Sequence, residues 1–259
     1  MVTVDSVATR LNKISASSAG GPTSVKSPPR IWKQANIPPV PKGTSIEDFN
    51  KDLRPISLTS TLFKVTEGFS IDKELEPVRL ECTDPNKFGF IPNSWTTFAL
   101  ISMLQHWPEA TDGTGSHVWA ALLDYRKASD LVDHNLLVAK LYSLGVKPTV
   151  VNRVAGFLRE RSQRGKLGSD CFSEFTPVPA GISLDTCIGP CLFLVMINDL
   201  TTTDNSLSAM WKFADDTTDS EVVPKFGRSN LQATVDHVLN WSNGNKVNSF
   251  RCKELRVSV

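Results

Sequence analysis

The chain has 259 residues, of which 40% are hydrophobic and 21% are charged. These proportions exclude an intrinsically disordered protein and fit one large folded domain or two smaller ones. The net charge of +1 points to no class of partner. The longest apolar run, residues 187–197, is about half the length of a membrane-spanning helix, and the first residues lack the pattern of a secretory signal. We therefore expect an intracellular protein, cytoplasmic or nuclear, with no membrane partner.

In the first half of the chain, a mobile leader is expected over residues 1–30, which are rich in Ser, Ala, Gly and Pro. The prolines of residues 31–42 predict an extended segment and argue against a helix. Helical periodicity follows over residues 59–78 and again over residues 96–107, where Pro108 is expected to end the helix.

The second half of the chain contains an almost continuous apolar run, VWAALLDY (residues 118–125), that ends near an acid. This pattern predicts a buried strand with a functional residue at its end. The other predicted elements are a helix from residue 134 to Gly145, a helix from Pro148, a hairpin over residues 164–182, a helix from Pro190, two strands around an acidic turn over residues 208–223, a helix capped by Ser229, and a C-terminal strand.

Basic residues gather between Lys140 and Lys166, where seven of them stand against the single acid Glu160. Such a cluster could hold phosphate groups, but it is equally typical of a solvated helix face. The five cysteines complete no zinc-binding pattern, because Cys187 and Cys191 have no CxxC pair or histidine beside them. We expect reduced, buried thiols at these positions.

The most informative feature is the acidic pair Asp215–Asp216 in the turn of an apolar hairpin. Aspartate is a common turn former, so the pair alone also fits a purely structural turn. Asp124 follows a buried strand, and a sheet that sets this strand beside the hairpin would bring three carboxylates together. Three acids can share a small site only with a cation, and oxygen ligands suit Mg²⁺. Two such ions about 3.5–4 Å apart would serve in-line phosphoryl transfer.

A small metal-dependent nuclease would need a His or Glu cluster near this hairpin. Only Asp219 and Glu221 follow it closely. We therefore set the nuclease interpretation aside.

From about Ile31 to Val259, the chain resembles the reverse transcriptases of non-LTR (LINE-type) retrotransposons. In the fingers, WKQANIPPVPK and DLRPISLTSTLFKVTE are similar to the first two blocks of the family, and KFGF is similar to the next block. In the palm, LLDYRKASDLVDH resembles motif A, FADD resembles the two-acid box, and GNKVNSFRCKELRV resembles the last palm motif. Their order and spacing agree with the family throughout.

The resemblance implies an α+β fold, the fingers and palm of a right-hand polymerase, with an antiparallel palm sheet packed on helices. The fingers are expected over residues 31–110 and the palm over residues 111–259, with a fingers-like insertion at about 145–180. No thumb is expected. The implied function is RNA-directed DNA polymerisation with an RNA template, a DNA primer, deoxynucleoside triphosphates and two Mg²⁺ ions.

The resemblance also assigns roles to single residues. Asp124 and Asp215 would be the main metal ligands, with Asp216 as the second acid of the box. Arg54 is a candidate contact of the incoming triphosphate, although it also fits a surface arginine. Lys253 matches a lysine that could protonate or shield the departing pyrophosphate, or it is simply solvated. His134 is expected to cap the following helix.

This sequence departs from the family at three points. Ser129 replaces an aromatic residue that lies under the sugar, so we expect weaker selection of deoxynucleotides over ribonucleotides. Asp185 stands where the family has a glycine that lets the backbone approach the nucleotide or template, and this change could abolish activity. The chain stops after the palm, which suggests a truncated or decayed copy. A catalytically inactive, nucleic-acid-binding remnant of a retrotransposon is therefore the alternative.

Overall fold

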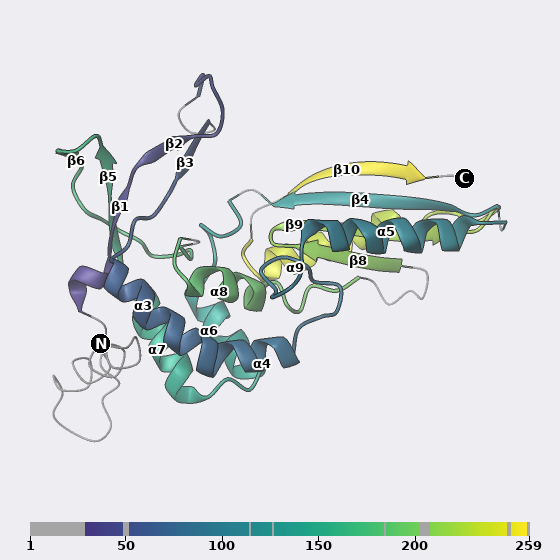
Figure 1. The fold of residues 1–259 in the computed structure, drawn as a ribbon. Helices are drawn as coiled ribbons and strands as arrows, with labels where there is room; N and C mark the ends of the chain where they lie inside the picture. The colour runs from purple at the N-terminus through teal and green to yellow at the C-terminus, as the bar shows by residue number, and fades with distance from the viewer. Residues whose placement is uncertain are drawn as a thin grey trace. The chain divides into compact units, whose positions relative to one another are not determined.

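The computed structural model describes residues 29–257 except 49–51, 114, 126, 184, 203–207 and 248–249. The predicted leader therefore lies almost wholly outside the described residues. The chain forms two compact units (Figure 1). The first unit combines the chain up to Glu81 with His134–Leu192, and the second combines Cys82–Asp133 with Phe193–Val259.

The first unit is built from small strand groups and helices. Strand β1 (Gln34–Ile37) runs parallel to β5 (Ser162–Leu167), which also pairs antiparallel with β6 (Cys171–Phe172) and β7 (Thr176–Pro177). A separate antiparallel pair joins β2 (Pro39–Pro41) to β3 (Leu53–Pro55). The helices are η1 (Arg30–Lys33), α3 (Thr61–Ser70) with its continuation η2 (Ile71–Leu75), α4 (Glu76–Glu81), α6 (His134–Ser143) and α7 (Pro148–Leu158).

Aromatic and aliphatic side chains form the core of the first unit. The predicted inner face of α7 is confirmed, because Val151, Val154, Phe157 and Leu158 are all buried. The ring of Phe63 on α3 packs against Phe157 with 4.9 Å between their centroids. This contact joins the segment before motif A to the segment after it, so the unit is assembled from two distant parts of the sequence.

The second unit contains a four-stranded sheet that is antiparallel throughout. Its strand order is β10 (Phe250–Val257), β4 (His117–Tyr125), β9 (Asp216–Val223) and β8 (Ser208–Phe213). Two helices, α5 (Thr96–Thr111) and α9 (Leu231–Gly244), belong to the same unit. Helix α8 (Ile188–Met196) carries the chain from the first unit into the second.

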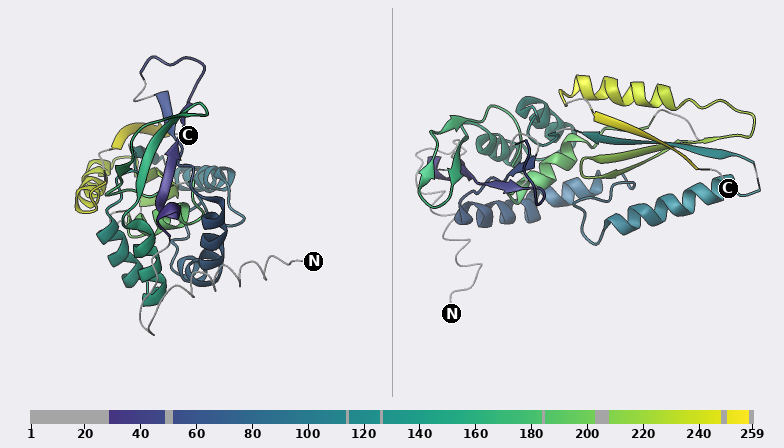
Figure 2. Two further views of the ribbon diagram at one scale, coloured as in Figure 1. Left: turned by 90° about the vertical axis from the view of Figure 1, so that its left-hand side faces the viewer. Right: turned by 90° about the horizontal axis from the view of Figure 1, so that it is seen from above.

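The two helices cover opposite faces of this sheet, as Figure 2 shows from above. On one face, Trp107 of α5 donates a hydrogen bond to Ser220 of β9 at 3.1 Å. On the other face, Ser242 of α9 donates to the hydroxyl of Tyr125 on β4 at 3.3 Å. The register places Ser220 opposite Ala120, so these two side chains share a face. Because successive side chains of a strand alternate between faces, Tyr125 lies on the face opposite to that of Ala120 and Ser220. The sheet packed on helices confirms the predicted α+β class.

Most predicted elements are found, but three details were wrong. Helix α5 does not end at Pro108; it continues to Thr111, where the Thr111 hydroxyl donates to the carbonyl of Trp107 and supports the last turn. Residues 30–33 form a short 3₁₀ helix, which takes up the first residues of the segment predicted to be extended. The cysteines predicted to be buried are exposed, apart from the half-buried Cys191. Among the described residues, no helix has both the length and the apolar character needed to cross a bilayer.

Asp219 is a buried acid in the middle of β9. Its side chain has no solvent exposure, and the nearby Thr202 hydroxyl only weakly offsets the burial of the carboxyl group. Burial raises the pKa of Asp219 to about 7 from an ordinary value of 3.8. The folded protein therefore holds a proton here that the unfolded chain releases as pH rises above about 4, so this group lowers the stability progressively up to about pH 7.

We predict that Asp219→Asn raises the melting temperature at pH 8 and has little effect near pH 4. Each unit by which the folded-state pKa is raised costs about 1.4 kcal/mol once the acid is ionised in the unfolded chain, so the removal of this group at pH 8 corresponds to several degrees in Tm. Thermal unfolding followed by circular dichroism at several pH values measures the difference. Asp236→Asn, a change at an exposed acid on α9, is the control and should leave Tm almost unchanged. An equal effect of Asp219→Asn on Tm at both pH values would contradict the raised pKa of Asp219.

Candidate active site

The turn between β8 and β9 carries two of the three predicted acids. Ala214 and Asp215 form the turn, and Asp216 is the first residue of β9, opposite Phe213 on β8. Ala214 has a φ of +54°, a left-handed conformation that is uncommon for residues other than glycine. The tight turn exposes both Asp215 and Asp216 at the end of the sheet.

Strand β4 brings the third acid to the same place. Its antiparallel register with β9 sets Asp124 directly opposite Asp216. Directly opposed residues project from the same face of a sheet, so the two carboxylates share one face. The predicted meeting of the motif A strand with the FADD hairpin is thus observed within a single unit.

The charges of the three acids affect one another. Although Asp215 is exposed as a residue, partial burial of its carboxyl group is the main cause that raises its pKa, and the neighbouring Asp124 raises it further. The pKa of Asp216 is also raised, first by burial and then by Asp215 and Asp124. Repulsion of this kind means that a bound cation would stabilise the ionised acids.

The sheet face that bears Asp124 is open at its acidic end. Toward the other end of β4, Val118 and Ala120 on the same face are fully buried. Leu122, in contrast, is 40% exposed, and Asp124 is exposed as well. Helix α5 therefore leaves a free strip of sheet beside the acids.

Strand β10 adds basic side chains to this strip. Arg251 lies opposite Asp124, and Lys253 lies opposite Leu122, both exposed and on the face of the acids. Lys253 was predicted as a site residue, but Arg251 was not. Only the strand register reveals Arg251, since nothing in its local sequence marks it.

The KFGF segment (residues 87–90) packs against β8 and the acidic turn. The N–H of Phe88 donates to the carbonyl of Lys212 on β8 at 2.9 Å, and the N–H of Lys212 donates to the carbonyl of Asn86 at 2.9 Å. Gly89 then lies against the turn, where an added Cβ would come within 2.3 Å of the backbone nitrogen of Ala214. Only glycine fits this position unless the turn moves.

Two buried lysines, Lys87 and Lys212, support the KFGF segment and β8 through bonds of their ammonium groups. The Lys212 ammonium forms an ion pair with Asp84 at 2.7 Å and also donates to the carbonyl of Leu200. The Lys87 ammonium donates to the carbonyl of Leu194 at 3.0 Å and to Asn198 at 2.7 Å. These bonds tie β8 and the KFGF segment to α8 and to the chain that follows it.

The other predicted site residues are divided between the two units. Ser129 is half-buried in the turn that follows β4, in the same unit as the acids. Arg54 is exposed on β3 in the first unit, opposite Val40 of β2. Asp185, also in the first unit, accepts a hydrogen bond from the backbone N–H of Ser57 at 2.5 Å. His134 does not cap α6 through its side chain; its ring nitrogen contacts the carbonyl of Gly181 at 2.8 Å.

The three acids supply the oxygen donors that suit a divalent ion. No group of three or more His, Cys, Asp or Glu side chains is arranged to hold a metal ion anywhere in the described ranges. The acids are therefore not a closed protein cage. Mg²⁺ usually takes one or two carboxylates together with waters and substrate phosphates, and the mutually repelling Asp124, Asp215 and Asp216 fit that requirement.

Comparison with protein families gives a match over most of the chain. The family model described as "Reverse transcriptase (RNA-dependent DNA polymerase)" matches residues 40–253. This range includes all three acids and the strands that carry them. Members of this family generally use divalent metal ions.

Two curated relatives come from Drosophila melanogaster. The chain is 28% identical over 242 residues to the RNA-directed DNA polymerase from mobile element jockey, covering 86% of this chain and 25% of the relative. It is 27% identical over 174 residues to the probable RNA-directed DNA polymerase from transposon BS, covering 66% of this chain and 19% of the relative. The chain thus spans a quarter or less of these relatives, and they confirm the resemblance to non-LTR retrotransposons.

Solved structures with a similar fold include telomerases of two yeasts. The Candida tropicalis telomerase in complex with a fragment of telomeric RNA has a TM-score of 0.60 at 10% identity, covering 96% of this chain and 44% of that chain. The corresponding Candida albicans complex has a TM-score of 0.58 at 12% identity, covering 89% and 43%. At these identities the likeness concerns the fold, and it confirms the predicted polymerase architecture.

We predict that Asp124→Asn lowers the pKa of both Asp215 and Asp216, because it removes a negative charge that raises both values. Carboxyl-carbon NMR titration of isotope-labelled protein measures the change. Asp236→Asn, far along α9, is the control. Unchanged titration of both acids in Asp124→Asn would show that Asp124 does not interact with Asp215 or Asp216.

Proposed function

Because this chain belongs to the reverse transcriptase (RNA-dependent DNA polymerase) family, we propose that it adds deoxynucleotides to a primer 3′-hydroxyl along an RNA template. Asp124, Asp215 and Asp216 are the proposed catalytic residues. The observation that carries the proposal is the register of β4 on β9, which sets Asp124 opposite Asp216 beside the Asp215 turn.

Two Mg²⁺ ions are the proposed cofactors, with Asp124 and Asp215 as the main ligands and Asp216 beside them. When bound, such a pair activates the attacking hydroxyl and stabilises the leaving pyrophosphate. The protein's own part is to hold three acids on two paired strands, so that their geometry is fixed by backbone hydrogen bonds. Because burial and mutual repulsion raise the pKa values of Asp215 and Asp216, a nearby positive charge would lower these values and stabilise the ionised acids.

Three basic side chains are proposed to bind the nucleic acid and the nucleotide. Arg251 and Lys253 lie on the open face beside Asp124, where they suit the phosphates of a primer strand. Lys253 is also the proposed partner of the pyrophosphate. Arg54, exposed on β3, is proposed to bind the incoming triphosphate through its guanidinium fork.

An inactive nucleic-acid-binding remnant is the second candidate, and Asp185 is the observation that favours it. Where the family has a glycine, this chain has a charged side chain that is bonded to the backbone of Ser57, three residues after Arg54. A carboxylate there repels the phosphates that Arg54 would bind. In this case the fold and the basic strip would remain while catalysis is lost.

Primer extension separates the two candidates. With an oligo-dT primer on a poly-rA template and Mg²⁺, we expect incorporation of dTTP by the full chain and its loss, by at least about a hundredfold, in Asp215→Asn. Asp219→Asn is the matched control, because it changes an acid in the same hairpin whose side chain lies on the other face of the sheet and is buried. Binding of primer–template without any incorporation would support the inactive remnant and contradict catalysis.

We predict that Gly89→Ala lowers the rate of incorporation, because the added methyl group displaces the backbone of Ala214 and with it the acidic turn. A shift of about 1 Å in catalytic groups can cost about a hundredfold in rate. Gly244→Ala is the control, since an added Cβ there meets no atom within 4 Å. If both variants kept the parent rate, the turn would not depend on Gly89.

We also predict that this chain discriminates weakly between deoxynucleotides and ribonucleotides, and that Ser129→Phe strengthens the discrimination. An aromatic ring in place of the small Ser129 side chain would fill the space of a 2′-hydroxyl. The ratio of kcat/KM for dTTP and UTP measures the effect, with Ser129→Ala as control. If Ser129→Phe did not raise this ratio, position 129 would not contribute to the selection between the two sugars.

A further inference from the structure

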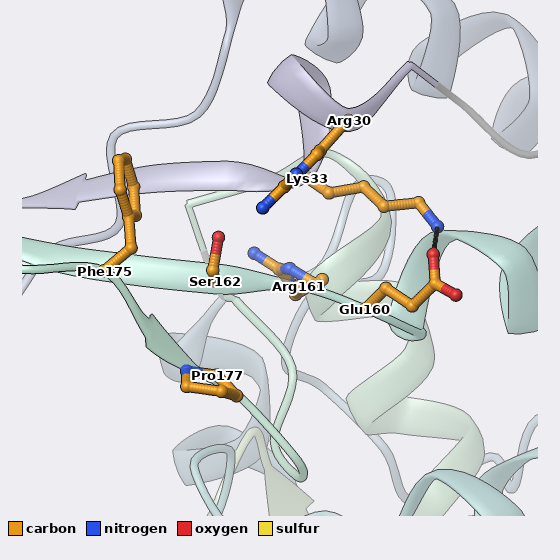
Figure 3. A pocket seen from close by; sticks show the side chains of 7 residues that line it. All are labelled: Arg30, Lys33, Glu160, Arg161, Ser162, Phe175 and Pro177. Carbon is orange, nitrogen blue, oxygen red and sulfur yellow. Dashed lines mark ion pairs between the residues drawn. The ribbon is translucent and has the colours of Figure 1, made fainter.

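A cavity of about 490 Å³ in the first unit collects basic side chains away from the acids (Figure 3). Its size lies within the range of about 300–1,000 Å³ that is typical of small-molecule sites. We call it the basic cavity. Its lining consists of Arg30, Lys33, Glu160, Arg161, Ser162, Phe175 and Pro177.

Two of the lining cations are buried although they face a cavity. Lys33 is only 4% exposed and Arg161 only 6%. Lys33 forms an ion pair with Glu160 at 3.7 Å, but the Glu160 side chain is 86% exposed, and exposed ion pairs of this kind contribute little. The Arg161 guanidinium lies 4.7 Å from the centre of the Phe157 ring. Burial of two weakly compensated cations is costly unless an anion joins them.

Glu67 lies near Arg161 and compensates its charge only weakly. The Glu67 carboxyl group is buried and accepts a hydrogen bond from the backbone of Cys187. Burial raises the pKa of Glu67 to about 8, against a smaller lowering by Arg161. Because burial disfavours the ionised form of Glu67, the positive charge of Arg161 remains available to the cavity.

The polar groups of the basic cavity converge on one space. In Figure 3, Arg30 extends from η1 on one side, and Arg161 and Ser162 extend from the start of β5 on the other. Two guanidinium groups and a hydroxyl form a donor set that matches phosphate oxygens. Phe175 and Pro177 lie at the end of the cavity opposite the Lys33–Glu160 pair and offer an apolar surface to a planar ring.

The charge of the lining favours one kind of phosphate. Three cations stand against one carboxylate, a net charge of +2 at neutral pH. A phosphate monoester carries about −1.5 to −2 at pH 7, whereas each phosphodiester within a strand carries only one negative charge. The lining therefore matches a terminal phosphate better than an internal one.

We infer that the basic cavity binds the terminal phosphate monoester of a nucleotide, with the base against Phe175 and Pro177. The nucleotide is either a free nucleoside monophosphate or the 5′-phosphorylated end of a strand, since both present the same chemistry. This site uses none of the proposed catalytic residues, so it does not depend on the polymerase activity.

The test is fluorescence anisotropy of the full chain with a short 3′-labelled RNA, at fixed salt and without divalent ions. We expect the 5′-phosphorylated RNA to bind at least about tenfold more tightly than the same RNA with a 5′-hydroxyl, because a charge-assisted contact is lost in the latter. If the two RNAs bind equally, AMP is titrated alone by calorimetry: AMP binding that Arg161→Gln removes would identify the free nucleotide as the ligand and support the site. Equal binding of both RNAs and no binding of AMP would overturn it.

Variants locate the binding. Arg30→Gln and Ser162→Ala change an exposed and a half-buried side chain, so the fold should persist, and we expect each to reduce phosphate-dependent binding about three- to tenfold. Arg161→Gln should abolish it, with circular dichroism as a check on folding. Arg159→Gln, an exposed neighbour that does not line the cavity, is the matched control. Phosphate-dependent binding that survives both Arg30→Gln and Ser162→Ala would contradict the assignment.

Discussion

The antiparallel register between β4 and β9 decides where the acidic side chains of this protein meet. Asp124 of β4 lies opposite Asp216 of β9, so Asp124, Asp215 and Asp216 lie at the same end of one sheet. A slip of one residue would turn Asp124 to the face covered by α9. The register is held by a ladder that runs from His117 to Asp124 and by buried Val118, Ala120 and Leu123. The catalytic proposal and the mutual repulsion of the acids follow from this pairing, and the register of β10 on β4 then places Arg251 opposite Asp124.

The hairpin that carries Asp215 is supported as strongly as the sheet itself. Strand β8 lies at the edge of the sheet, and edges tend to be mobile or to pair wrongly unless they are covered. Here the backbone of Asn86 and Phe88 bonds to Lys212, while the Lys212 side chain is fully buried against Asp84. Gly89 then fits against the turn. An exposed turn with two repelling acids is thus held by groups that are remote in sequence.

The local sequence predicted the helices and strands well, because short segments carry the patterns of burial and of turn-forming residues. The strand ending near Asp124 and the FADD hairpin are clear examples, and the family resemblance supplied their pairing. The contribution of Gly89 could not be predicted, since it depends on an approach between residues more than a hundred positions apart. Arg251 and the basic cavity share this cause: each arises where distant strands or helices meet. Pro108 misled the prediction because a tertiary setting and the Thr111 hydroxyl sustain the helix beyond it.

The claim that Asp124 and Asp215 share a divalent ion is tested most directly by Mn²⁺ binding, followed by electron paramagnetic resonance of the free ion. The double-mutant cycle of Asp124→Asn and Asp215→Asn is the decisive form of this measurement. If both acids serve one site, each variant weakens Mn²⁺ binding by about tenfold or more, and the double variant loses little beyond the single ones. Losses that simply multiply, or an Asp124→Asn variant that binds Mn²⁺ as well as the parent, would contradict the shared site.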